Sequence, residues 1–440
     1  MTNIGNDQES LERALMQARQ AMAAGQLAQA VEVYTAILGV DASHAEALNA
    51  LAMNAMRSGD LGKGVGLLEK AAQIHPRDAL TLNNLGQAYQ AANASQQALA
   101  AYTAALSVKP ELYVTRLSVA RLLEQAGRGD EALPLYFKAI ADAQRHGRWL
   151  SADSTSLNLQ PLVQHAIRVV NEGRRKLFGR LMDGLQQQFG SAGLTRVADC
   201  LAAYLGERQV QYSDPEQRPT FLYFPGLPAS PYLDKRLVPE LEQLEASTEA
   251  IRYELLAVLD GQTGMERVFL DDSVEDVNLR GYRGKPSWNG YYFHRHGDPR
   301  KDNRAACPYT AAALDRLPLC RVREHGPETL FSVLAPGTHL LPHRGVTNTR
   351  SVGHLALIVP PDCALSVSGI EYQWSESSTV LFDDTYSHEA WNKSDRLRIV
   401  LIFDIWNPYL TEMERAAVKE LVMAIGDFRV AGETLPALPA

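Results

Sequence analysis

The stretch RIVLIFDI at residues 398–405 decides the fold of the second half of this 440-residue chain. Its β-branched and aromatic side chains favour an extended strand. Runs of the same kind lie upstream, separated by turn residues such as Pro-Gly and Asn-Lys-Ser-Asp, at residues 330–334, 354–359, 364–368 and 379–382. Short strands at this spacing predict a sandwich or barrel of antiparallel sheets.

Residues 239–261 interrupt the strand pattern with apolar side chains at helical spacing, including Leu241, Leu244, Ile251 and Leu255. Intervals of three and four residues place such side chains on one face of a helix. We therefore expect an antiparallel double-sheet jelly roll, or double-stranded β-helix, with helices covering one face.

The first third of the chain repeats itself at a period of 34 residues. One column of the repeat holds turn residues: Gly25, Gly59, Asn93 and Gly127. Other columns hold small residues that let paired helices approach (Ala30, Gly64, Ala98, Ala132) and large apolar residues (Tyr34, Leu68, Tyr102, Tyr136). The period and these columns resemble the tetratricopeptide repeat over residues 11–144.

Arrays of this kind stack into an all-α superhelix, and the concave face commonly holds peptides or protein partners. The resemblance therefore implies protein or peptide binding; an array that only scaffolds or dimerises the chain is the alternative. The predicted organisation is an α+β multidomain chain. Besides the repeats it has a disordered N-terminus (1–10), a helical connector (145–205), a β-rich domain (206–425) and a C-terminal tail (426–440).

Composition narrows the possible partners and the compartment. A net charge of −8 argues against nucleic acid or an anionic membrane as the main partner. No apolar run reaches the roughly 20 residues that span a bilayer, and the polar start lacks the pattern of a secretory signal. The four cysteines have no CxxC spacing, which favours a reduced, cytoplasmic protein; pairing of Cys307 with Cys320 stays open.

Two histidines and one arginine near the end of the chain carry the chemistry. His343 lies in the sequence Pro-His-Arg-Gly, His388 follows Phe382-Asp383-Asp384 by a few residues, and Arg398 comes ten residues later. Neutral imidazoles suit Fe(II), and a guanidinium binds a carboxylate through two parallel hydrogen bonds. The combination favours an oxygenase that consumes a dicarboxylic keto acid, although Gly345 stands where a ligand carboxylate often follows the first histidine.

Residues of about 218–412 resemble the aspartyl/asparaginyl β-hydroxylase family of Fe(II)- and 2-oxoglutarate-dependent oxygenases. The stretches that carry the resemblance are FSVLAPGTH (331–339), PHRGVTN (342–348), FDDTYSHEAW (382–391) and RIVLIFDIWNP (398–408). The family binds iron with two histidines and no carboxylate, which implies that His343 and His388 are the metal ligands. The same pattern accounts for Gly345, and dioxygen would take an open position on the iron.

The resemblance also implies roles for other residues. Arg398 would bind the distal carboxylate of 2-oxoglutarate beside the hydroxyl of Ser332. His354 matches a position near this co-substrate, with a core histidine as the alternative, and Arg350 matches a basic position that would bind an acidic substrate side chain. For Asp383 and Asp384, we expect a turn role, or orientation of a ligand imidazole, in preference to binding iron.

One position departs from the family pattern. Val352 replaces a basic residue that helps to hold carboxylate groups in the active site. The resemblance implies a dioxygenase that hydroxylates a protein or peptide side chain, with the repeats recruiting the substrate. Because of Val352, a repeat-based interaction scaffold with a catalytically impaired oxygenase domain is the alternative. A hydroxylase of lipid acyl chains or small molecules ranks below both.

Overall fold

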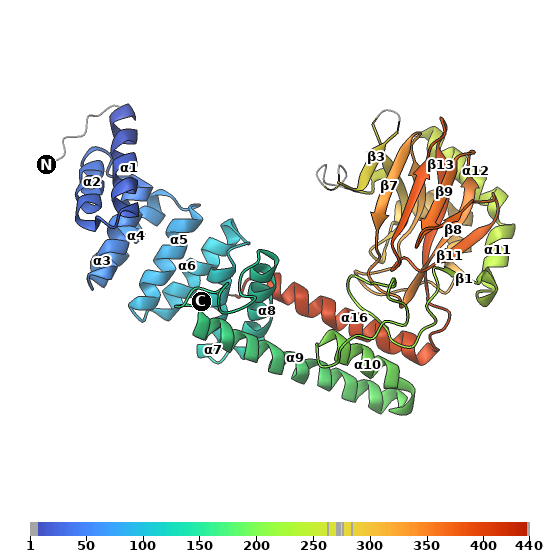
Figure 1. Cartoon of the computed structure of the whole chain (residues 1–440), viewed down its shortest axis with the longest axis horizontal. Coiled ribbons are helices and arrows are strands. Elements are labelled where there is room, and N and C mark those ends of the chain that lie inside the picture. The colour runs from blue at the N-terminus through green and yellow to red at the C-terminus, as the bar shows by residue number, and fades with distance from the viewer. Residues whose placement is uncertain (1–7, 262–263, 270–273, 275–276, 283–284, 438–440) are drawn as a thin grey trace. The chain divides into compact units, whose positions relative to one another are not determined.

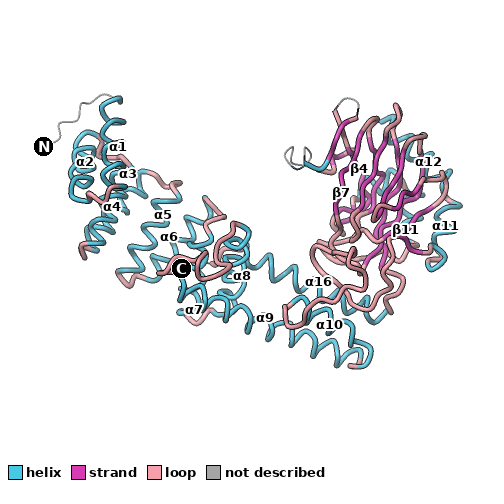
Figure 2. The backbone as a smooth tube through the Cα atoms, viewed as in Figure 1, coloured by secondary structure: helices cyan, strands magenta, loops and turns pink. Residues whose placement is uncertain are grey.

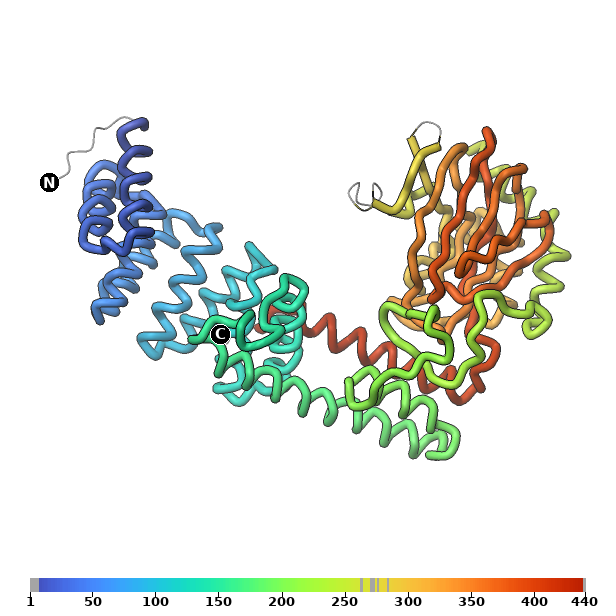
Figure 3. The backbone as a smooth tube through the Cα atoms, viewed as in Figure 1, coloured from blue at the N-terminus to red at the C-terminus, as the bar shows by residue number. Residues whose placement is uncertain are grey.

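The computed structural model of this protein describes residues 8–261, 264–269, 274, 277–282 and 285–437. The chain forms two compact units, one made of residues up to Gly173 together with those from Asp427 onward, and one made of Arg174–Gly426. Figures 1 and 3 trace the chain through both. Most of the disorder predicted for residues 1–10 falls outside the described residues. Within the described ranges, no helix is long and apolar enough to cross a membrane.

The first unit contains the predicted repeats as four helix pairs. The pairs are α1 (Gln8–Ala23) with α2 (Leu27–Val40), α3 (Ala45–Arg57) with α4 (Leu61–Ile74), α5 (Ala79–Ala91) with α6 (Ser95–Val108), and α7 (Tyr113–Gln125) with α8 (Gly129–Arg145). The predicted turn column lies between the paired helices with φ from 60° to 87°, a left-handed conformation that favours Gly and Asn. The columns of small and of large apolar residues are buried.

Two long helices, α9 (Gln160–Phe189) and α16 (Glu412–Glu433), cross the boundary between the units. The first part of the predicted C-terminal tail, which begins at residue 426, is helical up to Glu433. Burial stabilises this end: the ring of Phe428 lies 5.2 Å from that of Phe137, and Arg116 donates to the carbonyl oxygen of Gly432. Residues 438–440 of the predicted tail lie outside the described residues.

The second unit contains two antiparallel sheets, as the short β-branched runs predicted (Figure 2). One sheet has the order β1 (Tyr232–Leu233), β11 (Thr379–Phe382), β8 (Arg350–Ile358), β13 (Arg398–Trp406), β6 (Thr329–Leu334), β4 (Trp288–Arg295) and β2 (Glu266–Arg267), with β5 (Asp298–Pro299) paired to β4. The other has the order β10 (Ile370–Tyr372), β9 (Cys363–Val367), β12 (His388–Asn392), β7 (Thr338–His343) and β3 (Leu279–Gly281).

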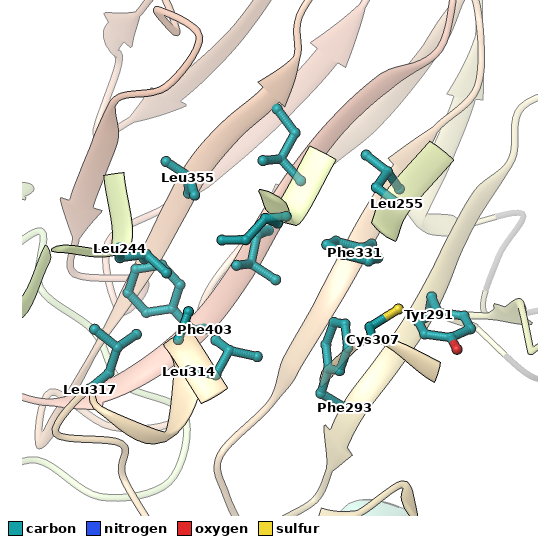
Figure 4. Packing of buried hydrophobic residues seen from close by; sticks show 14 of the residues in the cluster. Leu244, Leu255, Tyr291, Phe293, Cys307, Leu314, Leu317, Phe331, Leu355 and Phe403 are labelled. Carbon is teal, nitrogen blue, oxygen red and sulfur yellow. The ribbon is translucent and has the colours of Figure 1, made fainter. Parts of the chain in front are cut away.

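Helices cover one face of the larger sheet, and the main hydrophobic core lies between these helices and the sheet. Besides parts of α9 and α16, the described residues of this unit include the helices α10 (Thr195–Tyr204), α11 (Glu240–Ala246), α12 (Thr248–Gly261), α14 (Lys301–Ala306) and α15 (Pro308–Asp315). Leu244 of α11, Leu255 of α12 and Leu314 of α15 pack with Phe331 and Phe403 of the sheet (Figure 4). All four cysteines are buried and unpaired, so Cys307 and Cys320 form no disulfide.

The other face of the larger sheet turns toward the smaller sheet. Odd-numbered residues of β13 join the helix-covered core, whereas Val400 packs with Val352 and Phe382 in a second cluster. That cluster also contains Leu365 of β9 and Ala390 of β12, which come from the smaller sheet. Successive side chains of a strand point to opposite faces. The even-numbered side chains of β6, β8 and β13 therefore line the space between the sheets.

Truncating a core leucine tests this division of faces. Leu355 is fully buried beneath the helices, whereas Leu256 on α12 keeps 51% of its surface exposed. We expect Leu355→Ala to lower the free energy of unfolding of this unit by about 2 to 5 kcal/mol, and Leu256→Ala by less than about 0.5 kcal/mol. Tryptophan fluorescence during urea unfolding reports on this unit, because only Trp149 lies outside it. Equal losses for the two variants would contradict the assigned faces.

Candidate active site

Two imidazoles meet on neighbouring strands of the smaller sheet. His343 ends β7 and His388 begins β12, and the two residues are direct partners in the antiparallel register. Their ring centroids lie 4.1 Å apart. The sheet thus brings together two residues that stand 45 positions apart in the chain.

The hydrogen bonds of both imidazoles leave the same nitrogen available. Nδ1 of His343 lies 2.9 Å from the carbonyl oxygen of Leu341, and Nδ1 of His388 lies 3.1 Å from that of Tyr386. Because a carbonyl oxygen only accepts, each Nδ1 carries the proton and each Nε2 carries the lone pair that a metal needs. Burial, reinforced by the neighbouring His388, lowers the pKa of His343 to about 4, and burial also lowers the pKa of His388. Both rings are therefore neutral at physiological pH.

Arg398 is buried between the sheets without a carboxylate partner. Only 2% of its surface is exposed, and its Nε has no hydrogen-bond partner. Its Nη1 lies 3.4 Å from the hydroxyl of Ser332, which accepts a 2.9 Å hydrogen bond from the indole of Trp288. Among the described residues no acidic side chain forms an ion pair with it. Burial lowers the pKa of Arg398 to about 10, so the side chain stays charged at neutral pH.

A buried charge without a counter-ion is costly, and proteins normally pair it. The charge on Arg398 therefore indicates a site for an anionic ligand that the fold is built to receive.

His354 lies beside this charge and is neutral as well. It is 6% exposed, and its Nδ1 has no partner. Burial first, and then the charge of Arg398, hold the pKa of His354 well below its ordinary value. Its ring makes an edge contact with Phe382 at 5.0 Å, and Phe382 in turn lies 5.5 Å from His388. These ring contacts connect the imidazole pair to the arginine site.

Arg350 and Val352 lie four and two residues before His354 on β8, so the three side chains share one face of the strand. The guanidinium of Arg350 pairs with Asp404 at 2.6 Å and with Asp384 at 3.4 Å, so two carboxylates of the chain itself balance its charge. Its predicted role in binding a substrate stays a prediction. Val352 is 8% exposed and packs in the apolar cluster with Phe382 and Val400, where it adds no cation to the site.

Gly345 and the acidic pair complete the surroundings of the histidines. A Cβ atom at Gly345 would lie 2.0 Å from Cγ of Asp384, so the aspartate side chain fills the space beside the glycine. Asp383 accepts hydrogen bonds from the backbone and hydroxyl of Thr385, as a turn residue does. Within the described ranges, no group of three or more His, Cys, Asp or Glu side chains is arranged to hold a metal. The candidate metal site therefore offers the two imidazoles as its protein ligands.

Two tryptophans of this site escaped the sequence reasoning. Trp374, in the loop after β10, lies under the guanidinium of Arg398, and Trp288 of β4 holds the hydroxyl of Ser332. Neither residue stands at an informative distance from the histidines in the sequence. Only the folding of the chain brings both indoles to the site, one from a strand and one from a loop.

Comparisons with known proteins find matches for both parts of the chain. A family model described as Aspartyl/Asparaginyl beta-hydroxylase matches residues 245–408, and one described as Tetratricopeptide repeat matches residues 15–79 and 83–147. The human protein named Aspartyl/asparaginyl beta-hydroxylase is 26% identical over 355 residues, which cover 80% of this chain and 41% of that protein.

Other relatives match about half of this chain. A Rhizobium tropici protein named Ornithine lipid ester-linked acyl 2-hydroxylase is 30% identical over 235 residues, 51% of this chain and 76% of that protein. The human Aspartate beta-hydroxylase domain-containing protein 2 is 29% identical over 206 residues, 46% of this chain and 54% of that protein. This chain spans about two fifths of the length of the human and mouse proteins named Aspartyl/asparaginyl beta-hydroxylase.

The contact between Gly345 and Asp384 can be tested with a double-mutant cycle. Gly345→Ala places a methyl group against the buried carboxylate, and we expect a loss of about 1 to 3 kcal/mol in the stability of this unit. Asp384→Ala removes the obstacle, so the double variant should lose less than the sum of the two single variants. Urea unfolding followed by tryptophan fluorescence measures all four proteins. Additive losses would show that the methyl group meets something other than Asp384.

Proposed function

We propose that this chain, which belongs to the aspartyl/asparaginyl β-hydroxylase family, is an Fe(II)- and 2-oxoglutarate-dependent dioxygenase that hydroxylates a protein or peptide side chain. The names of its relatives support hydroxylase chemistry. Iron, 2-oxoglutarate and a peptide substrate are our finer assignments. In this proposal the two antiparallel sheets of the second unit form a double-stranded β-helix, with the reaction between them.

The observation that carries the proposal is the charge of Arg398, buried without a counter-ion in the same interior as the imidazole pair. A dicarboxylic keto acid has the groups that such an interior needs: one carboxylate for the guanidinium and a keto acid end for the metal. A guanidinium suits the first task because it stays charged when buried and binds a carboxylate in a fixed fork.

Each side chain would have a defined part in binding. Nε2 of His343 and Nε2 of His388 would hold Fe(II), and the backbone carbonyls on the two Nδ1 atoms fix the rings in that orientation. Arg398 would bind the distal carboxylate, with the hydroxyl of Ser332 oriented toward it by Trp288. The unpartnered Nδ1 of His354 fits a role in binding the same co-substrate.

When bound, Fe(II), 2-oxoglutarate and dioxygen would supply the oxidation that replaces a substrate hydrogen by hydroxyl, with succinate and carbon dioxide as the other products. The protein itself would position the reactants and exclude water from the reacting centre. Phe382, Val352 and Val400 form an apolar wall beside the imidazoles, and such a wall keeps water from the reacting centre. The tetratricopeptide repeats would recruit the protein or peptide that is hydroxylated.

Metal binding can be tested with two histidines of the same strand. His343 faces the space between the sheets, whereas His339 on β7 is held by Glu389 at 2.7 Å and by the hydroxyl of Tyr282 at 3.0 Å. An anaerobic titration of the wild-type chain with Fe(II) and 2-oxoglutarate should develop a visible charge-transfer band. We expect His343→Ala to abolish the band, because one of two protein ligands is lost, and His339→Ala to keep it. A wild-type chain without the band at saturating iron and co-substrate would refute the proposal.

Co-substrate binding can be tested with two arginines of similar position. Arg398 is buried, whereas Arg396 is exposed two residues earlier. We expect Arg398→Gln to weaken the affinity for 2-oxoglutarate at least about thirtyfold, the effect of losing roughly 2 kcal/mol or more from a buried charge pair.

The matched variant Arg396→Gln should bind 2-oxoglutarate like the wild type in isothermal titration calorimetry. The unliganded Arg398→Gln chain should also unfold at no lower temperature than the wild type, because the substitution removes an unpaired buried charge. Equal affinities of the two variants would exclude Arg398 from the co-substrate site.

Val352 favours a second candidate function, that of a repeat-based interaction scaffold with an impaired oxygenase domain. The space where the family carries a second cation is apolar here, so one carboxylate of the co-substrate would lack a counter-ion from the protein. The two candidates differ in one measurement. A chain that forms the charge-transfer complex but releases no succinate in air, with or without candidate peptides, would support the scaffold.

A further inference from the structure

The loop after β10 places an indole between the two co-substrate residues. Cζ of Arg398 lies 5.2 Å from the ring centroid of Trp374. The imidazole of His354 stacks on the same indole, with centroids 6.0 Å apart and 25° between the planes. Trp374 is 8% exposed, so this packing occupies nearly all of its surface.

Packing alone does not explain the polar edge of this side chain. Nε1 of Trp374 is buried without a hydrogen-bond partner, and the same holds for Nε of Arg398 and Nδ1 of His354. The indole and guanidinium nitrogens are donors only. Buried donors that face no acceptor are rare in folded proteins, because each loses its hydrogen bond to water. Donors from a loop and from β13, together with a ring nitrogen from β8, thus belong to side chains in mutual contact and lack a partner.

The protein itself supplies little that could satisfy them. Ser332 already accepts the hydrogen bond from Trp288. Cys363, whose charged form would interact favourably with Arg398, is neutral at physiological pH because burial raises its pKa. An anion with several acceptor oxygens fits the indole and guanidinium donors better than any side chain of the described part of the chain.

The loop that carries Trp374 is held firmly in place. Glu376 accepts a hydrogen bond of 2.9 Å from the backbone of Val359 and pairs with Arg252 at 3.2 Å. Arg252 also donates to the carbonyl oxygen of Leu357 at the end of β8. The loop is thereby tied to the strand that carries His354. A side chain on such a loop has a fixed position relative to that strand.

We propose that Trp374 is a binding and positioning residue for 2-oxoglutarate. Its ring face holds the guanidinium of Arg398 and the imidazole of His354 in place, and its Nε1–H donates to a carboxylate oxygen of the ligand. The inference rests on the function proposed above, and it adds a third donor, from the β10–β11 loop, to those of Arg398 and Ser332. This donor would offset part of the carboxylate binding that is lost because Val352 replaces a basic residue.

Ligand affinity tests the role of the indole N–H. The full chain is loaded with Zn(II), which takes the place of Fe(II) without redox chemistry, and is titrated calorimetrically with 2-oxoglutarate. Trp374→Phe keeps an aromatic ring but removes the donor, and we expect about tenfold weaker binding, as for the loss of a hydrogen bond to a charged group. Trp374→Leu also removes the stacking and should weaken binding further. Trp391→Phe is the matched control, because Trp391 packs on His339 and Lys393 instead.

A spectroscopic readout separates a direct hydrogen bond from a merely structural role. The wild-type chain is labelled with ¹⁵N-tryptophan and loaded with Zn(II), and its five tryptophans give the indole N–H resonances to be followed. On addition of 2-oxoglutarate we expect one resonance to move downfield, as formation of a hydrogen bond requires. That resonance should be the one missing in Trp374→Phe. This measurement on the wild type stands even where the variant does not fold.

The possible failures can be told apart. If Trp374→Phe binds 2-oxoglutarate as tightly as the wild type and no indole resonance moves, the role of Trp374 is refuted. The proposed function survives that result as long as Arg398→Gln still weakens the binding of 2-oxoglutarate as predicted above. If the wild-type chain itself takes up no 2-oxoglutarate, both the proposed function and this inference are overturned.

Discussion

The alternation of side chains along β13 is the constraint on which the second unit depends. This strand pairs with β6 on one side and with β8 on the other, so its two faces are fixed by two ladders at once. One face supplies Leu401 and Phe403 to the helix-covered core, and the other carries Arg398 toward the smaller sheet. A shift of one residue in the register would exchange the two sets. It would bury the guanidinium under the helices, so the packing of the core also determines the site.

The smaller sheet supplies the two imidazoles of the same interior. The register of β7 with β12 sets His343 opposite His388, and an irregularity in the ladder follows between His388 and Ala390. Backbone carbonyls two residues earlier hold both Nδ1 atoms, so the orientation of the rings depends on the strand ends and not on acidic neighbours. The Asp384 carboxylate lies against Gly345 and pairs with Arg350. Because these contacts occupy the carboxylate of Asp384, the two histidines remain as the candidate metal ligands.

Arg350 and Arg398 show how the same side chain serves two purposes in one interior. Both are largely buried on strands of the larger sheet. Asp404 and Asp384 outweigh the effect of burial on Arg350 and raise its pKa, whereas Arg398 has no such partners and its pKa is lowered by burial. The charge of the first arginine is balanced within the protein. The second is left for a ligand, at a cost to the stability of the unliganded protein. Stability given up at a ligand site is a common feature of binding proteins.

The sequence by itself determined the elements and the reactive residues. The period of 34 predicted the helix pairs because each repeat must place the same small and large residues at the same contacts. The β-branched runs predicted the strands because alternation is a local property of the chain. His343, His388 and Arg398 were recognisable because their motifs are continuous in the sequence. These features depend on residues that are close together along the chain, so they can be recognised from the sequence without the structure.

Only the tertiary structure decided which of these residues lack a charge partner or a hydrogen-bond partner within the protein. The pairing of Arg350 with Asp404 joins positions 54 residues apart, and the contact of Arg398 with Trp374 joins a strand to a distant loop. The helical end of the chain up to Glu433 likewise depends on a contact with Phe137 in the repeats. Burial and the presence or absence of a partner are properties of the folded interior. They arise from contacts between distant segments, which no local pattern of residues specifies.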